Sequence, residues 1–115
     1  MSSNPFEQPG RFFKGNLHTH SNTSDGQLSA DEVCSRYRER GYDFLCLSDH
    51  FLPVYDFPVT DTRPLRTDSF TTILGAEMHV PATALGEKWH LLANGLPIDF
   101  APPHEGESAP EIAAR

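Results

Sequence analysis

The apolar run Phe44–Leu47, with the sequence FLCL, limits the fold of this chain more than any other feature. Continuous apolar residues over this length are typical of a strand buried on both faces, as in a parallel sheet. The segment between Ser29 and Gly41 is expected to be a helix, because Ser29 and Glu32 can form a capping box and glycine commonly ends a helix. A first strand is expected at Phe12–His18. Strand, helix and buried strand in this order predict a right-handed βαβ unit and an α/β fold.

Further strands and a second helix are expected later in the chain. The segment Phe51–Asp68 contains three prolines and is a loop long enough to act as a lid over a site. A third strand is expected at Thr71–Met78 and a fourth at Trp89–Leu96, joined by Val80–Lys88. We therefore predict about four parallel strands with one full helix, followed by a helix that starts near Ser108.

The composition argues against two classes of partner. The 115 residues carry a formal net charge of −7, whereas binding to nucleic acid or to an anionic membrane requires a basic patch. Residues 1–11 are polar and lack the apolar run of a signal peptide, so we expect a flexible N-terminal arm on a cytoplasmic protein. The cysteines, Cys34 and Cys46, lie among apolar residues without zinc-type spacing and are expected to be buried.

Two histidines, His18 and His20, stand two residues apart at the end of the first expected strand. Side chains at this spacing point to the same side of a strand, so both imidazoles would face one point. Imidazole is a common ligand of zinc and iron, and Asp25 in the following polar loop could add an oxygen ligand. A pair of surface histidines at a strand end is the alternative interpretation.

Residues that bind metals recur at the ends of the other expected strands. His50 follows the second strand, Glu77 lies at the end of the third, and His90 lies at or within the fourth. The C-terminal ends of parallel strands meet at one face, which is where α/β barrels have their active sites. Four strands that each supply His, Asp or Glu to this face favour a functional site, in which the two oxygens of Glu77 could bridge two cations.

These motifs resemble the first motifs of the PHP family, named after polymerase and histidinol phosphatase. The resemblance rests on Gly15–Ser21 (GNLHTHS), Ser24–Gly26 (SDG), Leu47–His50 (LSDH) and Gly75–Glu77 (GAE). The residues of these motifs and their spacing are most similar to those of the stand-alone metallohydrolases of the CehA/McbA type. The resemblance implies a distorted (β/α)7 barrel that holds two or three divalent metal ions, namely Zn, Mn or Fe.

The resemblance also implies which residues would bind the metals. The six implied ligands are His18, His20, Asp25, His50, Glu77 and His90. The first two histidines and the glutamate would hold one ion, and the glutamate would bridge to a second ion that the last histidine also binds. The aspartate and the third histidine would hold a third ion.

Four other residues have weaker expected roles. Asp49 is expected to orient His50 or a bound water, since a metal-bound imidazole usually has an acceptor for its other nitrogen. His79 lies two residues after the expected bridging glutamate and could touch a substrate, although a supporting or surface role is the favoured interpretation. Arg63 and Arg66 in the long loop could meet a phosphate, or could simply be solvated.

The chain departs from the family pattern after His90. The later His motif and the final Asp-x-His motif are absent, so residues 12–115 are expected to be an N-terminal part of a PHP domain, inactive by itself and cut within the helix near Ser108. For the intact protein, the resemblance implies a metal-dependent hydrolase of a small-molecule substrate, most often a phosphoester in this family, which uses a metal-activated hydroxide. A non-catalytic metal-binding or scaffold domain is the alternative.

Overall fold

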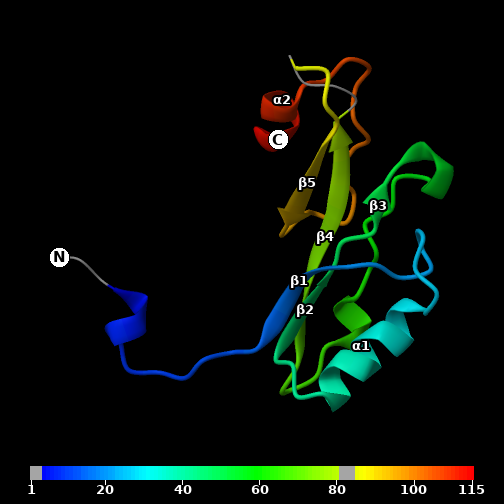
Figure 1. Cartoon of the computed structure of the whole chain (residues 1–115). Coiled ribbons are helices and arrows are strands. Elements are labelled where there is room, and N and C mark those ends of the chain that lie inside the picture. The colour runs from blue at the N-terminus through cyan, green and yellow to red at the C-terminus, as the bar shows by residue number, and fades with distance from the viewer. Residues whose placement is uncertain (1–3, 81–84) are drawn as a thin grey trace.

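The computed structural model of the chain describes residues 4–80 and 85–115 and shows a mixed α/β structure (Figure 1). Its five strands are β1 (Gly15–Thr19), β2 (Phe44–Leu47), β3 (His50–Phe51), β4 (Thr71–Val80) and β5 (Trp89–Asn94). They form a sheet of order β1-β2-β4-β3, in which β5 also pairs with β4. The described helices are α1 (Ala30–Glu39), α2 (Ala109–Ala113) and the short 3₁₀ helices η1 (Pro5–Glu7), η2 (Pro53–Tyr55) and η3 (Arg63–Leu65).

The first half of the sheet is the parallel βαβ unit that the sequence predicts. β2 pairs in parallel with β1 on one side and with the first half of β4 on the other. The register places Phe44 opposite both Gly15 and Thr71. The ring of Phe44 occupies the space where a side chain at position 15 would lie, so this strand needs glycine there.

α1 covers one face of this unit and starts where the sequence predicts. The Ser29 hydroxyl accepts a hydrogen bond from the backbone N–H of Glu32, whose carboxylate accepts one from the N–H of Ser29, and this is the expected capping box. The helix buries Val33 and Cys34 in a cluster with Phe70 and the side chains of β2. Both cysteines of the chain are buried, as expected, and burial raises the pKa of each thiol to about 11.

The fourth expected strand is present, but its predicted direction is wrong. β5 runs antiparallel to β4, with His90 opposite His79 and Leu92 opposite Glu77. A parallel return would need a crossover of a dozen or more residues, whereas residues 81–88 are all that separate the two strands. The chain therefore turns back directly beside β4. Of the expected connecting segment, residues 81–84 lie outside the described residues.

The second half of β4 gains partners on both sides. β3 pairs with it in parallel, with His50 opposite Glu77, and supplies a parallel strand that the sequence did not predict. Because β5 pairs with His79 and Val80, β4 extends to Val80 rather than ending at Met78. α2 packs on the same half through the buried Ile112.

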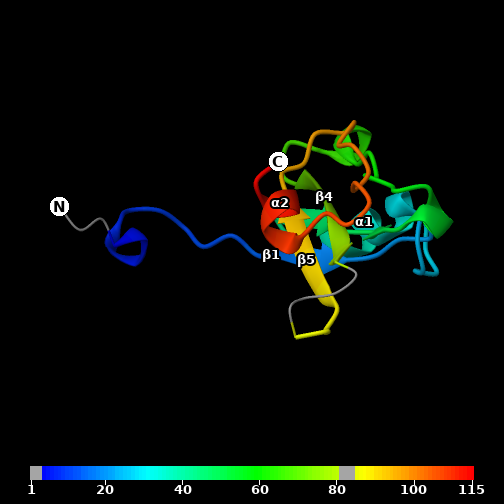
Figure 2. The same cartoon turned by 90° about the horizontal axis from the view of Figure 1, so that it is seen from above.

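The two ends of the described chain differ in how they contact the sheet. α2 follows the N-cap residue Ser108, in agreement with the predicted start of a second helix. Residues 4–10, which include η1 and belong to the expected arm, lead away from the sheet (Figure 2). No helix in the described ranges combines the length and apolar character needed to cross a membrane.

The buried carboxylate of Asp49 joins two loops that leave the sheet. Its Oδ1 accepts hydrogen bonds from the N–H of Ser21 at 2.7 Å and the hydroxyl of Ser24 at 2.6 Å. Its Oδ2 accepts from the hydroxyls of Ser21 at 2.8 Å and Thr60 at 2.6 Å. The backbone oxygen of Asp49 accepts a hydrogen bond from the N–H of Glu77 at 3.0 Å. This residue therefore fixes the loop after β1 and the loop after β3 relative to β4.

The substitution Asp49→Asn should lower the free energy of unfolding by roughly 1.5–3 kcal/mol, the contribution typical of hydrogen bonds to a charged group. The asparagine amide offers only one acceptor oxygen to donors that now use two. Urea unfolding followed by the fluorescence of Trp89, the one tryptophan of the chain, measures the change. Asp68→Asn, at an exposed position, is the matched control. Equal losses for the two variants would contradict the role given to Asp49.

The substitution Gly75→Ala should also destabilise the chain, by about 1–3 kcal/mol, the usual cost of overpacking. A Cβ at this position would lie 2.5 Å from the backbone oxygen of Ala93 and 2.5 Å from Sγ of Cys46. Gly10→Ala is the control, because nothing lies within 4 Å of a Cβ there. The same urea titration compares the two variants, and an unchanged midpoint for Gly75→Ala would show that β4 and β5 are not packed this closely.

Candidate metal centre

His18 and His20 leave the end of β1 toward a common point. The regular pairing of β1 with β2 is interrupted between Asn16 and Thr19, and the side-chain oxygen of Asn16 accepts a hydrogen bond from the N–H of His18 at 3.0 Å. The two imidazole rings lie 5.2 Å apart between centroids. Each Nε2 atom lies 3.3 Å from Oε2 of Glu77. The spacing read from the sequence therefore brings both rings to one carboxylate.

Glu77 is the centre of the cluster. Its side chain is only 6% exposed, and its Oε2 lies 3.3 Å from a nitrogen of each of three imidazoles, those of His18, His20 and His50. Its Oε1 lies 3.0 Å from Nδ1 of His90. Because β5 pairs directly with β4, His90 reaches this second oxygen of the carboxylate. The two carboxylate oxygens thus face separate sets of imidazoles.

Asp25 and His50 lie together at the outer side of the cluster. Nε2 of His50 is 3.2 Å from Oδ2 of Asp25, whose side chain is about half exposed, while Nδ1 of the same ring faces Glu77. The ring of His50 stacks on that of His20 with 4.4 Å between centroids. His50 therefore lies between the two acidic residues and contacts both.

His79 lies closer to the cluster than the sequence indicated. Its Nε2 is 2.8 Å from Nδ1 of His50, and its ring lies 4.3 Å from that of His90 between centroids. Its spacing from Glu77 along β4 was the available signal, since residues two apart share a strand face. The sequence could not show that β3 and β5 would each place a histidine against this ring.

Burial and neighbouring charges shift the pKa of two groups in the cluster, Glu77 and His79. Desolvation is the largest influence on Glu77 and raises its pKa, but a hydrogen bond from His18 and the charges of the neighbouring imidazoles outweigh it and leave the pKa below its usual value. The pKa of His79 is lowered, first by burial and then by the neighbouring histidines. Both directions favour an ionised Glu77 carboxylate beside a neutral His79 at neutral pH.

The donor atoms fit metal ions in number, type and spacing. Among the described residues, three groups have ligand atoms that all lie within 4.8 Å of one another. Their members are His18, His20 and Glu77; His20, Asp25 and His50; and His50, Glu77 and His79. The nitrogen–oxygen separations around Glu77 are 3.0–3.3 Å, which matches the edges of roughly 3.0–3.4 Å expected around an ion with ligand bonds of about 2.1 Å.

His90 and Asp49 stand apart from these three groups. His90 faces Glu77 through Nδ1 but belongs to none of the groups found among the described residues. Asp49 was expected to orient His50 or a bound water, but the hydrogen bonds described for its carboxylate go to Ser21, Ser24 and Thr60. Asp49 thus supports the site by fixing loops.

The two arginines of the long loop point to local partners. Arg63 forms a two-pronged ion pair with Asp61, at 2.8 and 2.9 Å, which lowers the pKa of that carboxyl to about 2. Arg66 donates hydrogen bonds to the hydroxyl and the backbone oxygen of Thr72. Neither guanidinium contacts the metal-type cluster in the described structure.

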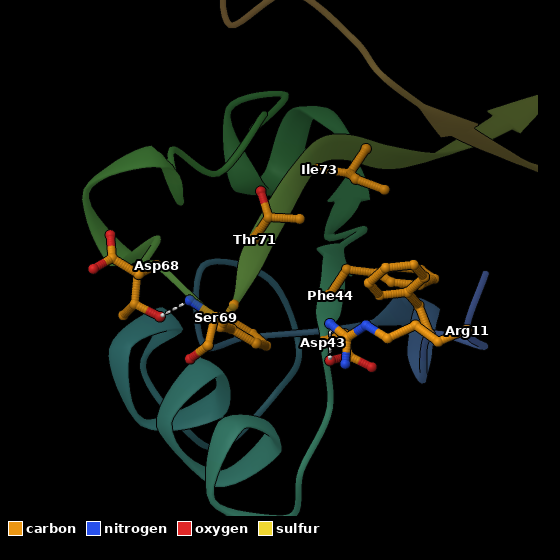
Figure 3. Close-up of a pocket in the computed structure, with 10 residues that line it drawn as sticks. Arg11, Asp43, Phe44, Asp68, Ser69, Thr71 and Ile73 are labelled. Carbon is orange, nitrogen blue, oxygen red and sulfur yellow. Dashed lines mark hydrogen bonds and ion pairs between the residues drawn. The ribbon is translucent and has the colours of Figure 1, made fainter.

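A pocket of about 480 Å³ lies at the other end of the strands (Figure 3). Its lining includes Arg11 and Phe13 before β1, Asp43 before β2 and Phe70 before β4, so it opens where these strands begin. The histidine cluster lies where they end. We therefore consider the histidine cluster, and not this pocket, to be the candidate functional site.

Comparison with known proteins adds one finding to this geometry. No curated protein and no solved structure matches the chain. The model of the PHP domain matches residues 16–101, a range that starts in β1, passes β5 and includes every residue of the cluster. Because this range covers well over half of the sequence, the chain belongs to the PHP domain family.

Proposed function

We propose that this chain provides the metal centre of a metal-dependent hydrolase whose substrate is a small-molecule phosphoester. The observation that carries the proposal is the buried carboxylate of Glu77, which four imidazoles approach from two sides at 3.0–3.3 Å. Imidazole nitrogens and carboxylate oxygens held this close together are a donor set that divalent cations bind. Membership of the PHP domain family supports hydrolysis, since the family suggests metal-dependent hydrolytic chemistry.

The arrangement supports a role for Glu77 as a bridge between two divalent ions. Its Oε2, with His18 and His20, would hold one ion, while its Oε1, with His90, would hold a second. The pair formed by Asp25 and His50 would hold a third ion, with help from the neighbouring imidazoles. Histidine nitrogens mixed with carboxylate oxygens suit Zn, Mn or Fe. Such ions supply a hydroxide at neutral pH and stabilise charge on a phosphoryl group.

The protein's own groups would set the geometry for that chemistry. Glu77 would hold the ions in place, because β2, β3 and β5 all pair with its strand and keep that strand fixed. Asp49 fixes the loop that carries Asp25. We also infer that the mixed sheet corresponds to the first strands of a distorted (β/α)7 barrel of the CehA/McbA type, in which the site lies at the C-terminal ends of the parallel strands.

The first test is metal content. His18→Ala should weaken binding of Zn²⁺ or Mn²⁺ by more than about 100-fold, since loss of even an indirect partner of a metal ligand costs 10–100-fold. Elemental analysis of the chain after metal loading and desalting measures the loss. His104→Ala, at an exposed position away from the cluster, should retain the metal. Unchanged metal content in His18→Ala would overturn the assignment of the centre.

The second test is hydrolysis by the natural gene product that contains residues 1–115. Glu77→Gln should reduce metal-dependent turnover of phosphomonoesters and phosphodiesters by at least about 100-fold, because the amide cannot bridge two cations with two oxygens. The control is Glu105→Gln, which makes the same chemical change at an exposed position away from the site. Full metal occupancy in the wild type with no turnover of any phosphoester would favour the alternative, a non-catalytic metal-binding scaffold.

A further inference from the structure

A second pocket, of about 430 Å³, opens directly beside the candidate metal centre. His79 belongs to both: it lines the pocket, and its Nε2 lies 2.8 Å from Nδ1 of His50 in the cluster. The other lining residues come from the end of β3 and the segment after it, the end of β4, and two later loops, where Lys88 and Pro103 lie. A molecule whose reacting group sat at the metal centre would have this pocket within reach of its remaining atoms.

The lining of this pocket is apolar with one cation. Six of its lining side chains are apolar, among them Phe51 and Phe57, and the remaining two are His79 and Lys88. None of the described residues that line it is acidic, although the chain as a whole has a net charge of −7. An apolar wall with a single cation suits a ligand that has both an apolar body and an anionic group.

The aromatic wall is held in an unusual backbone conformation. Asp56 and Phe57 have φ angles of 60° and 48°, in the left-handed region that residues with a side chain seldom adopt. The N–H of Phe57 donates to the backbone oxygen of Leu52 at 3.0 Å, and its ring meets that of Phe51 edge to face at 5.3 Å between centroids. Such conformations persist where the surrounding structure fixes them, often beside a ligand. The loop therefore places this ring at the pocket at a conformational cost.

We propose that the pocket binds the aromatic group of a phosphoester whose phosphoryl group lies at the metal centre, with Lys88 beside its anionic oxygens. This proposal rests on the hydrolase function given above and specifies its substrate class. A cavity of 150 Å³ is large enough for benzene, so about 430 Å³ accommodates a substituted or fused ring. The rings of Phe51 and Phe57 offer this group edge and face contacts.

The test compares two non-hydrolysable probes, phenylphosphonate and methylphosphonate, by calorimetric titration of the metal-loaded chain. The phenyl probe should bind about tenfold more tightly, because only its ring removes apolar surface from water in the pocket. Phe57→Ala should reduce this ratio to about twofold, and Phe57→Leu should leave it between these values. Val54→Ala, on the same segment but 77% exposed and outside the pocket lining, should keep the full ratio.

Lys88→Met separates the two parts of the proposal, since it removes the charge and retains an apolar side chain. It should weaken both probes by a similar factor, about threefold to tenfold, and leave their ratio unchanged. Equal affinity of the two probes in the wild type, no binding of either, or a ratio that both Phe57 variants retain would overturn the pocket assignment. Selective binding of the phenyl probe without phosphoester turnover would contradict the hydrolase function and support the pocket assignment. Phosphoester turnover without selectivity for the phenyl probe would support the hydrolase function and contradict the pocket assignment.

Discussion

The burial of one carboxylate, that of Asp49, determines how the loops of this protein leave its sheet. An ionised carboxylate inside a protein needs several donors to replace its lost hydration. Asp49 is fully buried and obtains them from Ser21, Ser24 and Thr60, which belong to two segments far apart in sequence. Each donor is therefore held near the end of β2. Because Ser21 follows His20 directly, the same hydrogen bonds that satisfy the carboxylate also restrict where the histidine can lie.

The second buried carboxylate, that of Glu77, has a different kind of surrounding. Hydroxyl and backbone N–H donors surround Asp49, whereas Glu77 faces imidazoles, which donate or accept according to their protonation. Glu77 lies in the half of β4 that pairs with β3 and β5. This position lets histidines arrive from both neighbouring strands. Asp49 therefore fixes loops beside the sheet, and Glu77 lies among side chains of the types that bind metals.

The sequence predicted the elements that depend on local signals and missed those that depend on distant ones. The capping box at Ser29, the strand Phe44–Leu47 and the start of β4 follow from residues close together in the chain, and the structure has them at the predicted places. The direction of β5 depends on the length of its connection, and a parallel strand was expected where the connection permits only an antiparallel one. The approach of His79 to the cluster depends on three strands at once, so spacing within one strand could not reveal it.

The charge of the centre bears on the order in which its ligands can bind. Glu77 and Asp25 bring two carboxyl groups to the cluster, within a chain whose net charge is already −7. An anionic phosphoester would be repelled from such a site, since like charges at close range in a partly buried site repel strongly. The divalent ions proposed for the site would reverse the sign of the centre. On this argument the metals would have to bind before a phosphoester substrate, because the ions would create the attraction for its phosphoryl group. Lys88 in the adjacent pocket would add one more positive charge beside such a substrate.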